Sequence, residues 1–299
     1  MITPPFLNQN DAVGIVSTAR KISSEEIRPF LNLLKSWGLK VVLGDTINAE
    51  EHQYAGTDTL RSEDFQRMLD NPDIKAIWCA RGGYGTVRMV DALDFTTFRK
   101  HPKWVIGYSD VTVLHSHIHT FGIETIHANM AMEMDVKTAA TKESVKEVLF
   151  GNDYQVTYPS QDQNHNRFGT VKATLVGGNL SLLHSLIGSP SALETKDKIL
   201  FIEDLDEYLY HIDRMMQNLK RNGLLKDLKG LVVGGMSDMN DNTIPFGKTA
   251  KEIVAEAVSA YDFPVCFDFP AGHIPDNRAL ILGREVTLAI SENSVSLTF

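Results

Sequence analysis

Short apolar runs that alternate with helix-like segments most limit how this 299-residue chain can fold. The first run, residues 12–16 (AVGIV), contains no polar residue, as expected of a strand buried on both faces. A segment with apolar residues at helical spacing follows it, and Gly38 ends that segment. Because this order repeats through residue 150, we predict a parallel sheet with helices on both faces.

The same pattern divides the chain into two domains. We predict an N-terminal α/β domain at 1–150, a linker rich in Asn, Gln and Asp at 151–170, and a C-terminal mixed α/β domain at 171–299. The predicted strands are 12–16, 40–43, 74–79, 104–106, 123–126, 174–176, 198–202, 231–233, 279–282, 285–289 and 295–299. The predicted helices are 27–37, 59–69, 87–93, 111–119, 180–186, 210–222 and 249–258. The last three strands are short and are expected to form antiparallel hairpins.

Composition narrows the class of protein. No apolar run reaches the ~20 residues that a membrane helix needs, and the N-terminus lacks a signal-peptide pattern. Cys79 and Cys266 each lie in an apolar strand-like run, so we expect buried free thiols. The net charge of −9 argues against broad nucleic-acid binding. These features predict a cytoplasmic protein with no membrane or nucleic-acid partner.

Ser109 lies between the apolar run 104–106 and a helical pattern that starts at Val111. A serine on a sharp strand-to-helix turn presents its hydroxyl above the sheet, beside the N–H groups of the helix start. Gly107 matches the first glycine of a G-x-S-x-G elbow, whereas Val111 occupies the place of the second. A serine is also a favoured helix N-cap. This stretch alone therefore leaves a nucleophile and a helix cap as alternatives.

A glycine-rich stretch, RGGYG at 81–85, follows the third predicted strand. Glycine at the carboxyl end of a parallel strand lets the backbone approach a ligand closely. No G-K-[ST] follows, which argues against a phosphate loop. An oxyanion hole, an anion cradle and an ordinary tight turn remain open. Because this stretch and Ser109 both follow the carboxyl ends of predicted parallel strands, we favour a functional role for the stretch.

Two further stretches offer an acid and a base. Glu203 opens the acidic stretch 203–207 and adjoins an apolar strand, so we expect it to be partly buried and aimed at one partner. A solvated acidic loop and a set of metal ligands are the alternatives. We expect the other acids of the stretch to lie at the loop surface or the cleft rim: Asp204, Asp206 and Glu207. His273 lies in a loop fixed by neighbouring glycine and proline, which suits a positioned general base. Together with Ser109 they give the order nucleophile, acid, base.

The other histidines do not predict a metal site. His115, His117 and His119 do not share one helix face, and no H-E-x-x-H pattern is present. We interpret these three as polar helix positions and expect neither a metal nor an organic cofactor.

Six stretches in order make the chain resemble the L,D-carboxypeptidases, the serine peptidase family that also contains the microcin C immunity peptidases. They are VGIVSTA near the start, ARGGYGTVRMVDALD at 80–94, VIGYSDVTVLH at 105–115, GGNLSLLHSLIGSP at 177–190, LFIEDLDEYLYHIDRMMQNL at 200–219 and FPAGHIPDNRALILG at 269–283. The likeness extends from about residue 11 to residue 288. The loop at 17–20 (STAR) departs from the family by lacking a proline, and it is expected near the substrate cleft.

The resemblance implies roles for particular residues. It implies Ser109 as nucleophile, Glu203 as the acid and His273 as the base, with an oxyanion hole made by the backbone N–H groups of Gly83 and Asp110. It also implies a nucleophile-bearing N-terminal domain, a C-terminal domain with the acid and base, and a homodimer.

The activity implied is release of the terminal D-alanine from murein tetrapeptides in peptidoglycan recycling. Arg81 or Arg214 is the predicted binder of the terminal carboxylate, since arginine binds carboxylates in a fork, although either residue also suits a structural ion pair. Cleavage of an aminoacyl-nucleotide analogue, as by a microcin C-type immunity peptidase, is the alternative. It would favour an aromatic platform for the base. All three tryptophans lie in core-like patterns, which leaves a tyrosine as the alternative platform. A catalytically inactive ligand-binding module is a third possibility.

Overall fold

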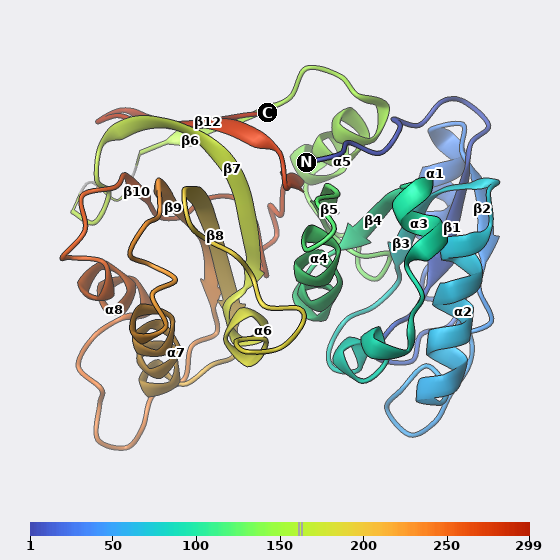
Figure 1. Cartoon of the computed structure of the whole chain (residues 1–299), viewed down its shortest axis with the longest axis horizontal. Helices are drawn as coiled ribbons and strands as arrows, with labels where there is room; N and C mark the ends of the chain where they lie inside the picture. The colour runs from blue at the N-terminus through green and yellow to red at the C-terminus, as the bar shows by residue number, and fades with distance from the viewer. Residues whose placement is uncertain (161, 163) are drawn as a thin grey trace.

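The computed structural model describes residues 1–160, 162 and 164–299 and arranges them in two lobes, each built on one sheet (Figure 1). The mixed α/β fold with a parallel sheet is therefore confirmed. Within the described residues, no helix combines the length and the apolar character needed to cross a membrane. Cys79 and Cys266 are buried free thiols, as predicted.

The first lobe contains a six-stranded sheet in the order β11-β5-β4-β3-β1-β2. Its parallel strands are β1 Ala12–Val16, β2 Lys40–Leu43, β3 Ile74–Cys79, β4 Trp104–Gly107 and β5 Thr125–His127. The helices of this lobe are α1 Arg28–Ser36, α2 Asp58–Asp70, α3 Thr96–Lys100, α4 Thr112–His119 and α5 Ala139–Phe150. Separate apolar clusters pack on the two faces of the sheet, which explains why its strands carry almost no polar residues.

The second lobe contains a seven-stranded mixed sheet in the order β10-β9-β8-β7-β12-β13-β6. Its strands are β6 Gln155–Pro159, β7 Gly169–Asn179, β8 Lys198–Leu205, β9 Gly230–Ser237, β10 Val265–Cys266, β12 Glu285–Ile290 and β13 Ser294–Thr298. Its helices are α6 Leu180–Ser185, α7 Leu209–Arg221 and α8 Ala250–Ala257. The four strands β7 to β10 are parallel, and the others are antiparallel.

Several elements differ from the sequence-based expectation. The segment 151–170 contains β6, an edge strand that pairs with β13, so it is not purely a linker; residues 161 and 163 of it lie outside the described residues. The helix predicted at 87–93 is a pair of 3₁₀ turns, Thr86–Arg88 and Val90–Ala92. Helices α3 and α5 were not predicted, because α3 spans five residues and α5 buries a narrow apolar stripe.

The tail also folds differently from the prediction. Strands β12 and β13 form the expected hairpin. Strand β11, Leu280–Leu282, instead crosses back and pairs antiparallel with β5 of the first lobe. This crossing ties the two lobes together, and a sequence pattern cannot reveal it because the choice of partner strand is a long-range packing decision.

The lobes meet at α4, which lies between the two sheets (Figure 1). The hydroxyl of Thr112, the first residue of α4, accepts the backbone N–H of Asn179 at 3.0 Å. A Cβ on Gly178, whose φ is +143°, would lie 2.6 Å from that hydroxyl oxygen. Glycine at 178 therefore allows the second lobe to approach the start of α4 closely.

Candidate active site

Ser109 occupies the turn between β4 and α4. Tyr108 is still extended, and Ser109 then has a φ of +60°, a conformation that few residues other than glycine adopt. A 3₁₀ turn, Ser109–Val111, follows directly and leads into α4. This strained strand-to-helix turn is the geometry of a nucleophile elbow, and a simple N-cap does not require it. The N-cap positions of this turn and of α4 are Tyr108 and Val111, so Ser109 is not the cap residue of either element.

The glycine-rich loop lies against this elbow. A Cβ built on Gly82 would come within 3.4 Å of the Cβ of Ser109, so the two backbones are close. The buried carboxylate of Asp110 turns inward and accepts the backbone N–H of Thr86 at 2.8 Å, which fixes the loop to the elbow. The loop therefore lies close to Ser109 at Gly82 and is hydrogen-bonded to the adjacent Asp110 at Thr86.

Glu203 lies near the carboxyl end of β8 and is fully buried. The pairing of β8 with β9 shifts register between Ile202 and Asp204. Such irregularities re-aim side chains near functional sites. Oε2 of Glu203 accepts a hydrogen bond from Nδ1 of His273 at 2.6 Å and from the backbone N–H of the same residue at 3.2 Å.

The loop that carries His273 is anchored on several sides. Gly272 has a φ of +106°, and a Cβ there would lie 2.7 Å from the Cβ of Glu203. The carbonyl oxygen of His273 accepts the hydroxyl of Ser237 at 2.7 Å, and that of Ile274 accepts the ammonium of Lys137 at 3.0 Å. Glycine at 272 thus allows the acid and the histidine to come together, and the anchors hold the ring in place.

Ser109 and His273 line one cavity of about 460 Å³, and Gly83 lies in its wall. The cavity is formed by residues of both lobes. Asp110 directly follows Ser109. Among the described residues, Ser109 makes no hydrogen bond to His273, as is common in catalytic sites before substrate binds. The structure thus places the predicted nucleophile and base in the wall of one cavity, with the predicted acid buried and hydrogen-bonded to the base.

The interaction between Glu203 and His273 shifts the pKa values of both groups. Burial by itself would raise the pKa of Glu203, but the charge and hydrogen bond of His273 outweigh it and leave the pKa below its ordinary value. Burial lowers the pKa of His273, but the charge and hydrogen bond of Glu203, together with the charge of Asp204, outweigh burial and leave the pKa above its ordinary value. The pair therefore favours an ionised acid beside a histidine that binds a proton readily.

Asp204 is not the surface or rim carboxylate that the acidic stretch predicted. It lines the cavity but is buried, and its oxygens accept the side-chain amide of Asn179 and the backbone N–H of Ser181, both at 2.9 Å. Burial and the neighbouring Glu203 charge raise the pKa of Asp204 to about 7. Asp206 and Glu207 lie at the cavity wall.

The two arginines predicted to bind the terminal carboxylate differ in their position relative to the cavity. Arg81 lines the cavity, and its guanidinium donates to the carbonyl of Lys21 at 2.9 Å. Arg214 is not among the cavity-lining residues and stacks over the ring of Tyr210 at 5.1 Å. Arg20, which we did not single out, also lines the cavity. Its place after β1, on the carboxyl edge of the sheet, was the signal that could have identified it.

Two of the three histidines interpreted as polar helix positions are buried. His115 bonds the carbonyl of Gly107 and His119 bonds the hydroxyl of Thr125. Burial lowers the pKa of each to about 3. Among residues 1–160, 162 and 164–299, no group of three or more His, Cys, Asp or Glu is arranged to hold a metal ion.

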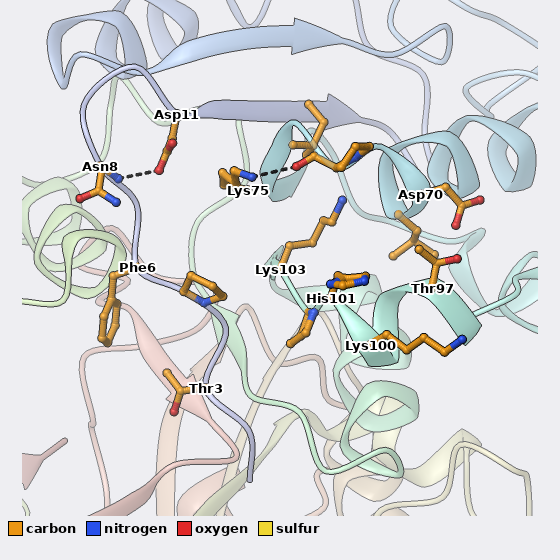
Figure 2. A pocket seen from close by; sticks show the side chains of 15 residues that line it. Thr3, Phe6, Asn8, Asp11, Asp70, Lys75, Thr97, Lys100, His101 and Lys103 are labelled. Carbon is orange, nitrogen blue, oxygen red and sulfur yellow. Dashed lines mark hydrogen bonds between the residues drawn. The ribbon is translucent and has the colours of Figure 1, made fainter.

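A second cavity, of about 680 Å³, opens at the end of the first sheet that is opposite to Ser109. It is lined by residues at the amino ends of strands, including Asp11 before β1 and Lys103 before β4. Its basic side chains do not converge: Figure 2 shows Lys100 and Lys103 pointing in different directions. Lys103 donates to the carbonyls of Met68 and Asn71, near the end of α2. Ligands of parallel α/β sheets bind at the carboxyl ends of the strands, where Ser109 lies.

Comparison with protein families gives matches to both lobes. Residues 13–128 match the LD-carboxypeptidase N-terminal domain, and residues 172–288 match the LD-carboxypeptidase C-terminal domain. The chain belongs to the LD-carboxypeptidase family. Ser109 lies inside the first matched region, and Glu203 and His273 lie inside the second.

Individual members of the LD-carboxypeptidase family align over nearly the whole chain. A probable murein peptide carboxypeptidase of Bacillus subtilis is 33% identical over 97% of this chain and 92% of its own length. The microcin C7 self-immunity protein MccF of Escherichia coli is 24% identical over 96% and 93%. The crystal structure of muramoyltetrapeptide carboxypeptidase from Oxalobacter formigenes superposes with a TM-score of 0.87, at 27% identity over 96% and 98%.

Proposed function

We propose that this protein is a serine L,D-carboxypeptidase that releases the terminal D-alanine from murein tetrapeptides during peptidoglycan recycling. The observation that carries the proposal is the 2.6 Å hydrogen bond from His273 to buried Glu203, beside a cavity that His273 shares with Ser109. Membership of the LD-carboxypeptidase family and the names of the aligned relatives support it.

Each member of the proposed triad has a defined step. Glu203 binds Nδ1–H of His273, which leaves Nε2 free to accept a proton. As Ser109 Oγ attacks the carbonyl carbon, His273 takes the hydroxyl proton and then delivers it to the leaving amine of D-alanine. The backbone N–H groups of Gly83 and Asp110 stabilise the oxyanion. Water then attacks the acyl-enzyme with His273 as base, which frees the shortened peptide and restores Ser109.

The charges of the cavity support a peptide substrate. Arg20 and Arg81 can bind the terminal carboxylate, since guanidinium groups bind carboxylates in a fork. Asp206 and Glu207 lie in the same wall and favour the amino group of a diamino acid. Arg214 is not proposed for this role, because it lies against Tyr210.

Cleavage of an aminoacyl-nucleotide analogue is the second candidate, and the relationship to MccF supports it. Two features disfavour it. Trp37, Trp78 and Trp104 are all buried, so none offers a stacking platform for a base. The acidic residues of the cavity would also repel an anionic nucleotide linkage.

We further propose that the enzyme acts in the cytoplasm, as a homodimer, on small peptides. The net charge of −9 supports the proposed lack of a nucleic-acid partner, and the lack of long apolar runs supports the proposed lack of a membrane partner.

The test is incubation of the purified protein with a murein tetrapeptide, with the same peptide amidated at its C-terminus, and with an aminoacyl sulfamoyl adenylate. We expect release of D-alanine from the free-acid peptide and much slower cleavage of the amide. Cleavage of the adenylate alone would support the second candidate. Binding without turnover of any of the three would indicate an inactive ligand-binding module.

A further inference from the structure

The second carboxylate oxygen of Glu203 has no assigned partner. Oε2 receives both hydrogen bonds from His273, whereas Oε1 is buried and has no hydrogen-bond partner among the described residues. An ionised carboxylate oxygen in a protein interior is costly without a hydrogen-bond donor. The geometry therefore calls for a donor on the Oε1 side of this carboxylate.

His127 is a buried side chain in the same region. It is the last residue of β5, it is fully buried, and neither ring nitrogen has a hydrogen-bond partner within the described part of the chain. A neutral imidazole always carries one N–H donor, and a buried donor normally finds an acceptor. Its ring therefore has a hydrogen to donate and no assigned acceptor.

The rings around His127 place it beside the acid. Its ring lies 4.9 Å from that of Phe201, which is two residues before Glu203 on β8. The ring of Tyr108 lies 5.8 Å from that of His127 and 4.7 Å from that of His273. His127 thus approaches the acid–base pair from the side of the first lobe.

The protonation of His127 fits the role of a donor. Burial lowers its pKa to about 4, although the Glu203 carboxylate opposes this effect. At neutral pH the ring is uncharged, so it offers one N–H without competing with His273 as a cation.

We propose that His127 is a positioning residue that donates a ring N–H toward Oε1 of Glu203 through one buried water. The bond holds the carboxylate in the orientation that presents Oε2 to His273. The inference rests on the proposed triad but not on the identity of the substrate.

Two substitutions separate this role from simple packing. His127→Phe keeps an aromatic ring against Phe201 and Tyr108 but removes the donor, whereas His127→Gln retains an N–H. We expect His127→Phe to lower kcat by about tenfold or more, with KM little changed, because orienting bonds of this kind act on the reacting group. His127→Gln should recover much of the loss. His119→Phe, at another buried histidine, is the control and should retain kcat.

A double-mutant cycle with Glu203→Gln gives the sharpest result. If His127 acts through the carboxylate, His127→Phe should cause little further loss in the Glu203→Gln background. Each variant is assayed for D-alanine release and for the rate of covalent labelling of Ser109 by a fluorophosphonate, with circular dichroism to confirm folding. The labelling rate depends on the triad and does not require the natural substrate.

The outcomes distinguish the inference from the proposed function. An unchanged kcat in His127→Phe, full additivity with Glu203→Gln, or equal damage by Phe and Gln would overturn the role of His127. Labelling of wild-type Ser109 without D-alanine release would refute the substrate while the labelling rates still test His127. If the fluorophosphonate did not label Ser109 in the wild type, Ser109 would not be the nucleophile, and the inferred role of His127 would be refuted as well.

Discussion

Nδ1 of His273 lies 2.6 Å from Oε2 of Glu203, and the backbone N–H of His273 donates to the same oxygen at 3.2 Å. One oxygen of a buried acid therefore holds both the ring and the backbone of the histidine. This double contact fixes the tautomer in which Nδ1 carries the hydrogen and Nε2 is free. It also joins β8 to a loop 70 residues later in the sequence.

Ser109→Ala should abolish turnover and leave the fold intact. We expect a fall in kcat of about 10⁴-fold or more, because removing a nucleophile leaves only binding and oxyanion stabilisation. The measurement is steady-state release of D-alanine from a murein tetrapeptide, with circular dichroism to monitor folding. A variant that kept more than about a tenth of wild-type activity would be incompatible with Ser109 as the nucleophile.

Glu203→Gln should lower kcat strongly with little change in KM. The substitution removes the charge that stabilises the His273 imidazolium, and an amide can hold the ring in the wrong tautomer. Asp206→Asn and Glu207→Gln are the matched controls and should do much less. Asp204→Asn should also spare kcat relative to Glu203→Gln but lower stability, because Asp204 accepts the N–H of Ser181 in α6. If a control proved the most damaging, Glu203 would not be the orienting acid.

The pH profile of kcat/KM should report the same pair. His273 must be neutral to accept a proton, and Glu203 raises the pKa of His273 above its ordinary value of 6.5. Activity of the wild type should therefore fall as the pH decreases through that raised pKa. In Glu203→Gln the raising charge is gone, so the acidic limb should move to lower pH. If the acidic limb lay at the same pH in the wild type and in Glu203→Gln, the limb would not report the ionisation of His273.

Gly272→Ala should impair both stability and rate. A methyl group there would lie 2.7 Å from the Cβ of Glu203, and the backbone φ of +106° disfavours any side chain. Gly223→Ala is the control, because its φ is +77° but nothing lies within 4 Å of the added methyl. The control should lose about 1 kcal/mol in the free energy of unfolding and keep its kcat. Equal kcat in the two variants would show that the close approach is not required.

The cavity arginines should affect substrate binding. Arg20→Ala and Arg81→Ala should each raise KM for the tetrapeptide by roughly 5- to 150-fold, because a lost charge-assisted bond costs ~1–3 kcal/mol. Arg214→Ala should not, because Arg214 is not among the residues that line the cavity. Neither Arg20→Ala nor Arg81→Ala should change KM for an amidated peptide, because that peptide has no terminal carboxylate. An unchanged KM in both cavity variants would assign the carboxylate to another group.

Much of the site was readable from local sequence. The apolar run of β4, followed after Tyr108 by Ser109, left a nucleophile elbow and a helix cap as alternatives, and the strained φ of +60° is the geometry of an elbow. Glu203 adjoins the apolar part of β8, which predicted its burial. The same reasoning failed for Asp204, because its burial depends on Asn179 and on Ser181 in α6, and neither lies near it in the chain.

The sequence by itself determined most of the strands and helices in their order, and the residue types at the ends of the strands. Those properties depend on period and polarity within about ten residues. Only the tertiary structure decided that β11 returns to the first lobe, that Arg20 rather than Arg214 reaches the cavity, and that His127 lies beside the acid–base pair. These outcomes depend on which distant surfaces pack together, and a local pattern does not encode that choice.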